Sequence, residues 1–220
     1  MIMLQLFLLL FSFNLQICLG DNEKTEGKMD TNYMNQQAYK SLFAAKRREH
    51  IETAEKILHL NDYAKQYKMV EILGETIFPA MKDSKEKLEK ANYIPQSSPF
   101  PTDKNMQEAL GVVLESIPFF GDVLLRLPDI TKDVYKRHKK DWVPLFKWGM
   151  EFCQNSTFLF TGHHSTQLYL MSQEIGLIPE DPEYENPFRK SSEDPDIKIK
   201  LKTKSKKFKK GPKLRTRNEL

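Results

Sequence analysis

The sequence predicts an all-α protein: a compact helical bundle with a long, kinked N-terminal helix and a disordered, basic C-terminal tail. Apolar residues recur three or four positions apart through the body of the chain, which is the spacing of one helix face. No segment of the body shows the sustained period-two alternation of a half-buried strand. Apolar residues make up 40% of the 220 residues, which is enough to bury a core.

The longest helical pattern covers residues 32–92 and predicts one long helix or two continuous ones. Its spacing resembles a coiled coil, but the register drifts near Leu60, which favours a helix packed in a bundle. Gly74 and Pro79 are expected to kink it, because proline removes a backbone donor and clashes with the preceding turn. Three prolines then predict a loop over residues 94–101.

Shorter helices are expected after this loop. Thr102 is a plausible N-cap for a helix that Pro118 should interrupt. Pro128 is expected to begin the next helix, since proline is tolerated in a first turn. A helix over residues 142–153 and a last helix that stops at Gly176 complete the body.

Charge divides the chain into an acidic body and a basic tail. Residues 197–220 contain nine Lys and two Arg against one Glu, a net charge of +10, so the rest of a chain at +4 carries −6. This composition predicts a disordered tail. We expect the chain to be organised as a signal peptide at 1–20, a flexible segment at 21–31, a helical domain at 32–180, a proline-rich linker at 181–196 and the tail.

The N-terminal segment has the composition of a cleaved signal peptide. Residues 2–13 form a dense apolar run, shorter than the roughly 20 apolar residues that a bilayer-spanning helix needs. Gly20 offers a small residue at the cleavage point, and Cys18 occupies the third position before the cut. The alternative interpretations are a signal anchor and a buried N-terminal helix.

The last four residues, Arg217, Asn218, Glu219 and Leu220, resemble a retrieval signal of the endoplasmic reticulum (ER). The retrieval receptor reads such a signal through the Glu side chain, the terminal carboxylate and an apolar slot for Leu. Asn218 replaces the usual acid, which weakens this binding. Both ends of the chain together predict residence in the ER lumen with some secretion, and no membrane span.

Two residues close together in the sequence are candidate modification sites. Asn155 begins the only Asn-X-Ser/Thr sequon, Asn155-Ser156-Thr157, and is expected to carry a glycan on an exposed loop. Cys153 is the only cysteine left after cleavage of the signal peptide, so an internal disulfide is excluded. It is either a buried small hydrophobic residue or a thiol for an intermolecular disulfide or other reaction.

Sequence patterns of catalysis and metal binding are missing. There is no Cys-X-X-Cys, no His-Glu-X-X-His and no Gly-rich phosphate loop, so we expect no metal, no cofactor and no enzymatic activity. His163 and His164 are close to Cys153 in the sequence, but a nucleophile system would also need an oxyanion site. We interpret the pair as a polar loop that leads into a helix.

The basic tail admits two interpretations. It is a solvated spacer that holds the retrieval signal clear of the domain, or a docking arm for an acidic luminal partner. Its lysines could bind phosphate through charge alone. Aromatic residues are almost missing between them, so nucleic acid is not an expected partner.

Short motifs along the chain resemble the coiled-coil domain-containing protein 134 family. The most specific of them is Phe119-Phe120-Gly121-Asp122-Val123. The tail departs from the family, because it is almost purely basic instead of a mixture of Lys and Glu. The other motifs are Lys46-Arg47-Arg48-Glu49, Leu60-Asn61-Asp62, Gln66-Tyr67-Lys68, Trp148-Gly149, Phe152-Cys153 with Asn155, His164-Ser165, Gln173-Glu174 with Gly176, Asn186-Pro187-Phe188, Gly211-Pro212 and Glu219-Leu220.

The resemblance implies an N-glycosylated, ER-resident or slowly secreted helical protein without catalysis. It further implies association with endoplasmin, the luminal heat-shock chaperone, whose folding and glycosylation the family is thought to protect. Our main interpretation is therefore a non-enzymatic luminal accessory protein. The alternatives are a secreted, cytokine-like helical protein that damps mitogen-activated kinase signalling, and a nuclear adaptor that uses the Lys-rich tail.

Overall fold

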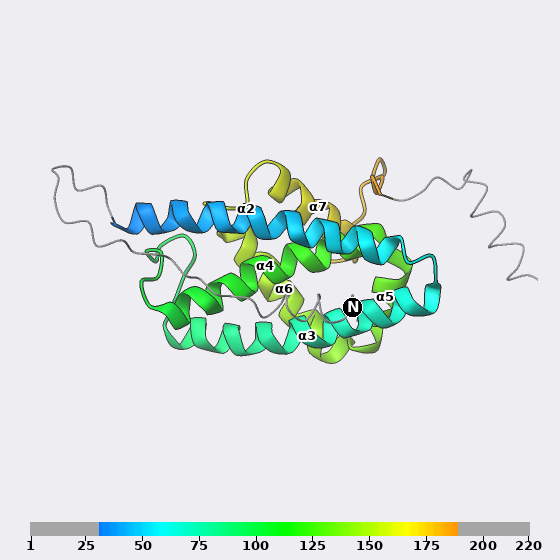
Figure 1. Ribbon diagram of the computed structural model, residues 1–220, viewed down its shortest axis with the longest axis horizontal. Coiled ribbons are helices and arrows are strands. Elements are labelled where there is room, and N and C mark those ends of the chain that lie inside the picture. Colours follow the sequence, from blue (N-terminus) through cyan, green and yellow to red (C-terminus); the bar gives the residue numbers. More distant parts are fainter. Residues whose placement is uncertain (1–30, 189–220) are drawn as a thin grey trace, which may run out of the picture. The chain divides into compact units, whose positions relative to one another are not determined.

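The computed structural model describes residues 31–188, and every regular element among them is an α-helix (Figure 1). The all-α prediction is therefore confirmed. The signal peptide, the expected cleavage point Gly20, the tail and the retrieval residues 217–220 lie outside the described residues. The helices are α2 (Thr31–Leu58), α3 (Tyr63–Lys90), α4 (Lys104–Arg126), α5 (Pro128–Arg137), α6 (Lys139–Asn155) and α7 (His163–Glu174).

The stretch predicted as one long helix or two continuous ones is a helical hairpin. The chain leaves α2 at Leu58 and returns as α3, which runs in the opposite direction (Figure 1). Asn61 has a φ of 50°, a left-handed conformation that ends helical propagation. The Asp62 side chain then caps α3 by accepting a hydrogen bond from the Lys65 backbone N–H at 3.1 Å. The register drift near Leu60 marks this reversal, so of the two predicted arrangements the single long helix is wrong and the pair of consecutive helices is found.

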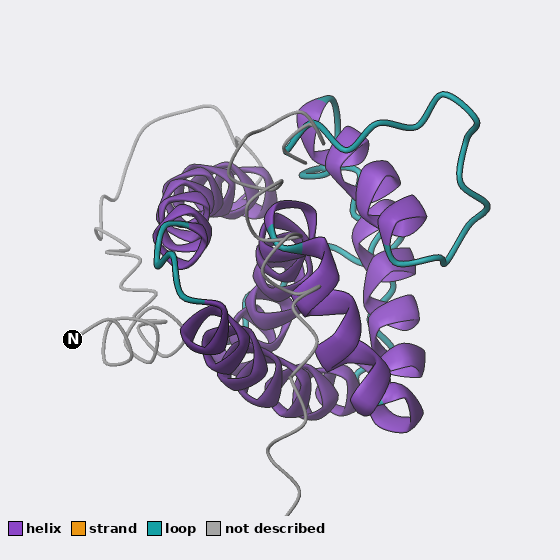
Figure 2. Ribbon diagram, turned by 90° about the vertical axis from the view of Figure 1, so that its right-hand side faces the viewer, coloured by secondary structure: helices purple, strands orange, loops and turns teal. Residues whose placement is uncertain are grey.

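Helix α4 is the centre of the bundle, because it contacts each of the other five helices. Figure 2 shows this bundle from its end. Asp103, not Thr102, caps it: the Asp103 carboxylate accepts from the Met106 N–H at 2.9 Å. The expected interruption at Pro118 is wrong, because α4 continues through that residue to Arg126. Almost every residue from Ala109 onward is buried, so packing on all sides outweighs the missing backbone donor.

Helix α3 is likewise continuous through Gly74 and Pro79. Gly74 has a packing role, since a Cβ there would lie 2.3 Å from an atom of the Trp142 ring. The indole also stacks on Phe78, with ring centroids 4.4 Å apart. Glycine at position 74 therefore lets α3 and α6 approach closely at this ring.

Two predicted boundaries in the second half are confirmed. Pro128 is the first residue of α5, and Gly176, with a φ of +77°, follows the end of α7. Helix α6 begins at Lys139, three residues before the predicted start, and ends at Asn155. None of the helices in residues 31–188 is both long and apolar enough to cross a membrane.

Candidate functional site

A buried ion pair joins helix α2 to helix α4. Arg47 from α2 and Asp122 from α4 approach to 2.6 Å, with side chains 5% and 6% exposed. Two of the motifs noted in the sequence, Lys46–Glu49 and Phe119–Val123, therefore meet in space. Charges this deeply buried are tolerated only when they are paired and hydrogen-bonded.

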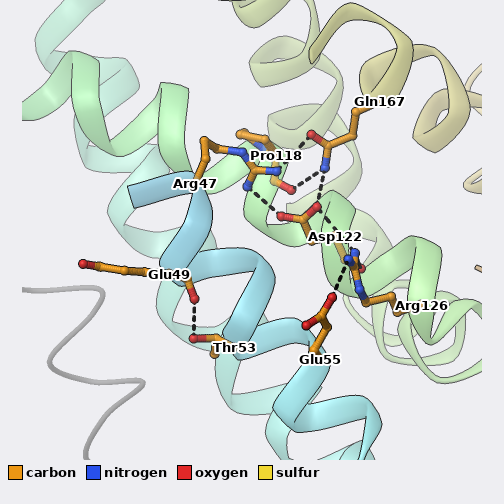
Figure 3. Close-up of polar contacts among 8 residues, drawn as sticks. All are labelled: Arg47, Glu49, Thr53, Glu55, Pro118, Asp122, Arg126 and Gln167. Atoms are coloured by element: carbon orange, nitrogen blue, oxygen red, sulfur yellow. Dashed lines mark hydrogen bonds and ion pairs between the residues drawn. The ribbon is translucent and has the colours of Figure 1, made fainter. Parts of the chain in front are cut away.

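Three further side chains extend this pair into what we call the α2–α4 network: Arg47, Glu55, Asp122, Arg126 and Gln167 (Figure 3). Gln167 of α7 accepts from Arg47 Nη2 at 3.1 Å and donates to Asp122 Oδ1 at 2.8 Å. Arg126 lies 3.7 Å from Asp122 Oδ1 and 3.5 Å from Glu55 Oε1. The network fixes α2, α4 and α7 against one another.

Burial dominates the electrostatics of this region. Desolvation raises the pKa of Asp122, and the attraction of Arg47 opposes the rise without cancelling it. The adjacent His50 ring is stacked on Phe119 with centroids 4.3 Å apart, and its Nδ1 has no hydrogen-bond partner within residues 31–188. Desolvation, then repulsion from Arg47 and Lys46, lowers the pKa of His50 to about 3. His50 is therefore a neutral core residue at physiological pH.

A second set of contacts, the strap network of Lys132, Glu174, Tyr184 and Asn186, attaches the segment after α7 to the helices. Glu174 Oε1 lies 2.5 Å from Lys132 Nζ. Its Oε2 accepts from Tyr184 Oη at 2.8 Å and from Asn186 Nδ2 at 3.0 Å. Asn186 also donates to the Leu125 carbonyl at 2.8 Å. The first residues of the expected linker are thus packed against the helical domain.

The strap network lowers the pKa of its central acid, Glu174, whereas the pKa of Asp122 in the α2–α4 network is raised. Burial raises the pKa of Glu174, but the hydrogen bonds from Lys132, Tyr184 and Asn186 outweigh it, so the pKa is lowered. Two further family-like motifs, Gln173-Glu174 and Asn186–Phe188, are brought together by these contacts.

A groove of about 220 Å³ lies beside α7. Exposed apolar side chains line it, including Tyr169, which is half exposed, and Ile178. Its other lining residues are Gln154, Phe160, Ser165, Leu168 and Ser172. This lining contains no charged side chain and no histidine that could activate either serine.

The predicted modification sites lie on α6. Asn155 is exposed at the last position of this helix, not on a loop, and its Oδ1 accepts from Gln96 Nε2 at 3.3 Å. Cys153 is fully buried and its Sγ lies 4.0 Å from the Val113 carbonyl oxygen. Burial raises the pKa of this thiol well above its usual range, so it stays protonated and is a poor nucleophile.

The two histidines open α7 and do not form a site with Cys153. His164 packs edge-on against Phe43 and Phe160. Within the part of the chain that the structure describes, no cluster of three His, Cys, Asp or Glu side chains could hold a metal ion. The residues that sequence reasoning missed are those of the two networks. Asp122 is the residue from which the α2–α4 network could have been predicted, since an acid inside the largely apolar segment 117–127 requires a buried partner.

Comparison with known proteins identifies the family. A family model described as "ERK and JNK pathways, inhibitor" matches residues 23–215. The chain belongs to this family. Proteins named Coiled-coil domain-containing protein 134 are relatives: the one from Xenopus tropicalis is 36% identical over 183 residues, 83% of this chain and 78% of the relative. The one from Mus musculus is 36% identical over 151 residues, 69% of this chain and 65% of the relative.

The resemblance noted in the sequence is therefore confirmed, and no solved structure matches the chain. The match to the ERK and JNK pathways inhibitor family includes all of residues 31–188, so both polar networks lie inside the family region. The names of the relatives and of the family describe coiled-coil or inhibitor proteins, not enzymes.

Proposed function

We propose that this chain is a non-enzymatic inhibitor of ERK and JNK signalling that acts by binding other proteins through its helical domain. The single observation that carries the proposal is the match of residues 23–215 to the inhibitor family. The buried charges of the α2–α4 network hold three helices together, so contact with a partner falls to exposed side chains. Exposed apolar side chains on α2 and beside α7, such as Leu42 and Tyr169, offer contact area for a partner.

The test is to add the purified full chain to cells and then stimulate both pathways. We expect lower phosphorylation of ERK and JNK at matched stimulus, measured by quantitative immunoblot. A variant destabilised at the α2–α4 network, Asp122→Ala, is the matched control and should weaken the effect. Unchanged phosphorylation both with added protein and with protein expressed inside the cells would refute the inhibitor proposal.

We further propose that the chain enters the ER lumen and is retrieved there, with some secretion. The support is the apolar run at residues 2–13, the Arg217–Leu220 ending and the sequon. Asn155 is exposed, and its bond to Gln96 uses Oδ1, so a glycan attached at Nδ2 would leave that bond in place. Deletion of residues 217–220 should move protein into the medium, whereas equal retention would refute retrieval.

Glycosylation has its own test. Glycosidase treatment of the natural protein should increase its mobility on a gel, and Asn155→Gln should abolish that shift. The exposed Asn92→Gln change, outside any sequon, is the control and should leave the shift intact. A natural protein that bears no glycan would contradict luminal entry.

Endoplasmin is the luminal partner that we propose, on the family resemblance alone. Capture of the tagged full chain from ER lumen should recover endoplasmin, and recovery should persist when residues 197–216 are replaced by a neutral linker. Such persistence would assign the contact to the helical domain. Capture that never contains endoplasmin after crosslinking would refute this partner and leave the inhibitor proposal standing.

A further inference from the structure

Four cations crowd the junction of α5 and α6. Lys136 and Arg137 end α5, and Lys139 and Lys140 begin α6, with His138 the single residue between the two helices. All four side chains are exposed. We call these four residues the basic corner.

Few of the charges in the basic corner are neutralised. Arg137 pairs with Asp133 at 3.4 Å and lies over the Tyr67 ring, 5.1 Å from its centroid. Lys136, Lys139 and Lys140 have no ion pair with any residue in 31–188. With the acids Asp133 and Asp141 counted, residues 133–141 keep a net charge of +2. Glu71 also lies near Arg137, but its carboxylate is paired with Lys68 at 2.8 Å.

The corner is held rigidly on the core by a stack of three rings. His138 stacks on Trp142 with centroids 4.0 Å apart, and Trp142 stacks on Phe78 at 4.4 Å. Gly74 gives the indole its space in this stack. The backbone that carries the four cations is therefore fixed before any partner arrives, which lowers the entropic cost of binding.

The helix macrodipole explains the positions of only two of the four cations. Lys136 and Arg137 at the end of α5 are favoured by the helix macrodipole. Lys139 and Lys140 stand in the first turn of α6, where the dipole is positive and disfavours a cation. Repulsion among neighbouring lysines adds to that cost. An external anion would relieve both terms.

The chemistry of the corner suits a linear polyanion as its partner. Cores of protein–protein interfaces are depleted in Lys and enriched in aromatic residues, but the aromatic residue here, Trp142, is buried. Long, exposed lysines instead suit charge-driven binding to a chain of repeated anions. We propose that the basic corner binds a sulfated polysaccharide of the heparin class. The choice of a sulfated polysaccharide over nucleic acid rests on the proposed secretory route.

The experiment uses the purified full chain and heparin as the probe, with affinity measured by titration at several salt concentrations. The corner variant is Lys136→Gln/Lys139→Gln/Lys140→Gln. The control Lys82→Gln/Lys87→Gln/Lys90→Gln removes the same charge from exposed positions of α3 that alternate with acids. A tail variant, Lys206→Gln/Lys207→Gln/Lys209→Gln/Lys210→Gln, separates the contribution of the tail. Circular dichroism verifies the helical content of each.

The corner variant should bind heparin on the order of 10- to 100-fold more weakly than the parent, with a shallower salt dependence. The control should stay within about twofold. Equal affinity of corner variant and control, or a loss confined to the tail variant, would overturn the proposal. Tighter binding of the parent to duplex RNA than to heparin would overturn the identity of the polyanion. Neither binding result depends on kinase signalling or on routing in cells.

Discussion

The α2–α4 network and the strap network both bury an acid beside a cation, yet they shift the pKa of that acid in opposite directions. In the first, Asp122 and Arg47 are both buried, and desolvation keeps the pKa of Asp122 raised. In the second, Glu174 is 2% exposed but Lys132 is 31% exposed, and the pKa of Glu174 is lowered. Only one partner of the second pair has lost its contact with water.

Asp122 lies deeper in the protein than Glu174, so desolvation weighs more heavily on its pKa; the number of short donors and the hydration of the cation then set how far the pKa is lowered again. Glu174 receives three side-chain contacts of 3.0 Å or less, and Lys132 keeps part of its hydration. The Arg47 side chain is buried away from water, and its Nε has no hydrogen-bond partner within residues 31–188. We therefore expect the α2–α4 network to be costly when broken and the strap network to add net stability.

The comparison is tested most strongly by Asp122→Ala, which leaves Arg47 buried without its counter-charge. We expect a loss of about 3–5 kcal/mol in the free energy of unfolding, measured by urea denaturation. Replacing both partners with apolar residues, Arg47→Met/Asp122→Leu, should recover part of that loss because no lone charge remains buried. The exposed Arg48→Ala is the control and should stay within about 0.5 kcal/mol. A double variant as unstable as Asp122→Ala would contradict this account.

Acid should weaken the α2–α4 region through His50. Its pKa is about 3 in the folded state and 6.5 when unperturbed, so the unfolded chain takes up the proton first and stability falls as pH drops from about 6.5 towards 3. The full effect is on the order of 3–5 kcal/mol. His50→Phe keeps a ring on Phe119 and should flatten the pH dependence of the unfolding free energy over this range. The exposed His59→Phe variant should retain the parental slope.

The smallest effect is expected from Glu174→Gln in the strap network, about 1–2 kcal/mol at neutral pH. Because the folded pKa of Glu174 lies below 4.5, its contribution is complete above that pH and is lost as pH falls through the folded pKa. The gap between parent and variant should therefore shrink in acid. Ionisation of Asp122 has the opposite effect on stability. Because its pKa in the folded state is raised above 3.8, ionising it destabilises the folded state. Glu183→Gln, exposed on the same segment, is the control, and a gap that widens in acid would invalidate the comparison.

Local sequence rules identified the elements that depend on neighbouring residues. The start of α5 at Pro128 and the stop at Gly176 were predicted correctly, because a proline ring and a positive φ act within one turn. The same rules misplaced the effect of Pro118, since surrounding helices stabilise α4 through this residue. The rules also gave no sign that Gly74 makes room for the indole of Trp142, 68 positions away.

By itself, the sequence determined that the chain is helical and which family it belongs to, because helical periodicity and short motifs are local properties. Only the tertiary structure decided that residues 32–92 fold back on themselves and that Arg47 meets Asp122 and, 120 positions along the chain, Gln167. Contacts over such distances depend on how whole helices pack. The same packing that buries Asp122 also leaves the four cations of the basic corner facing water.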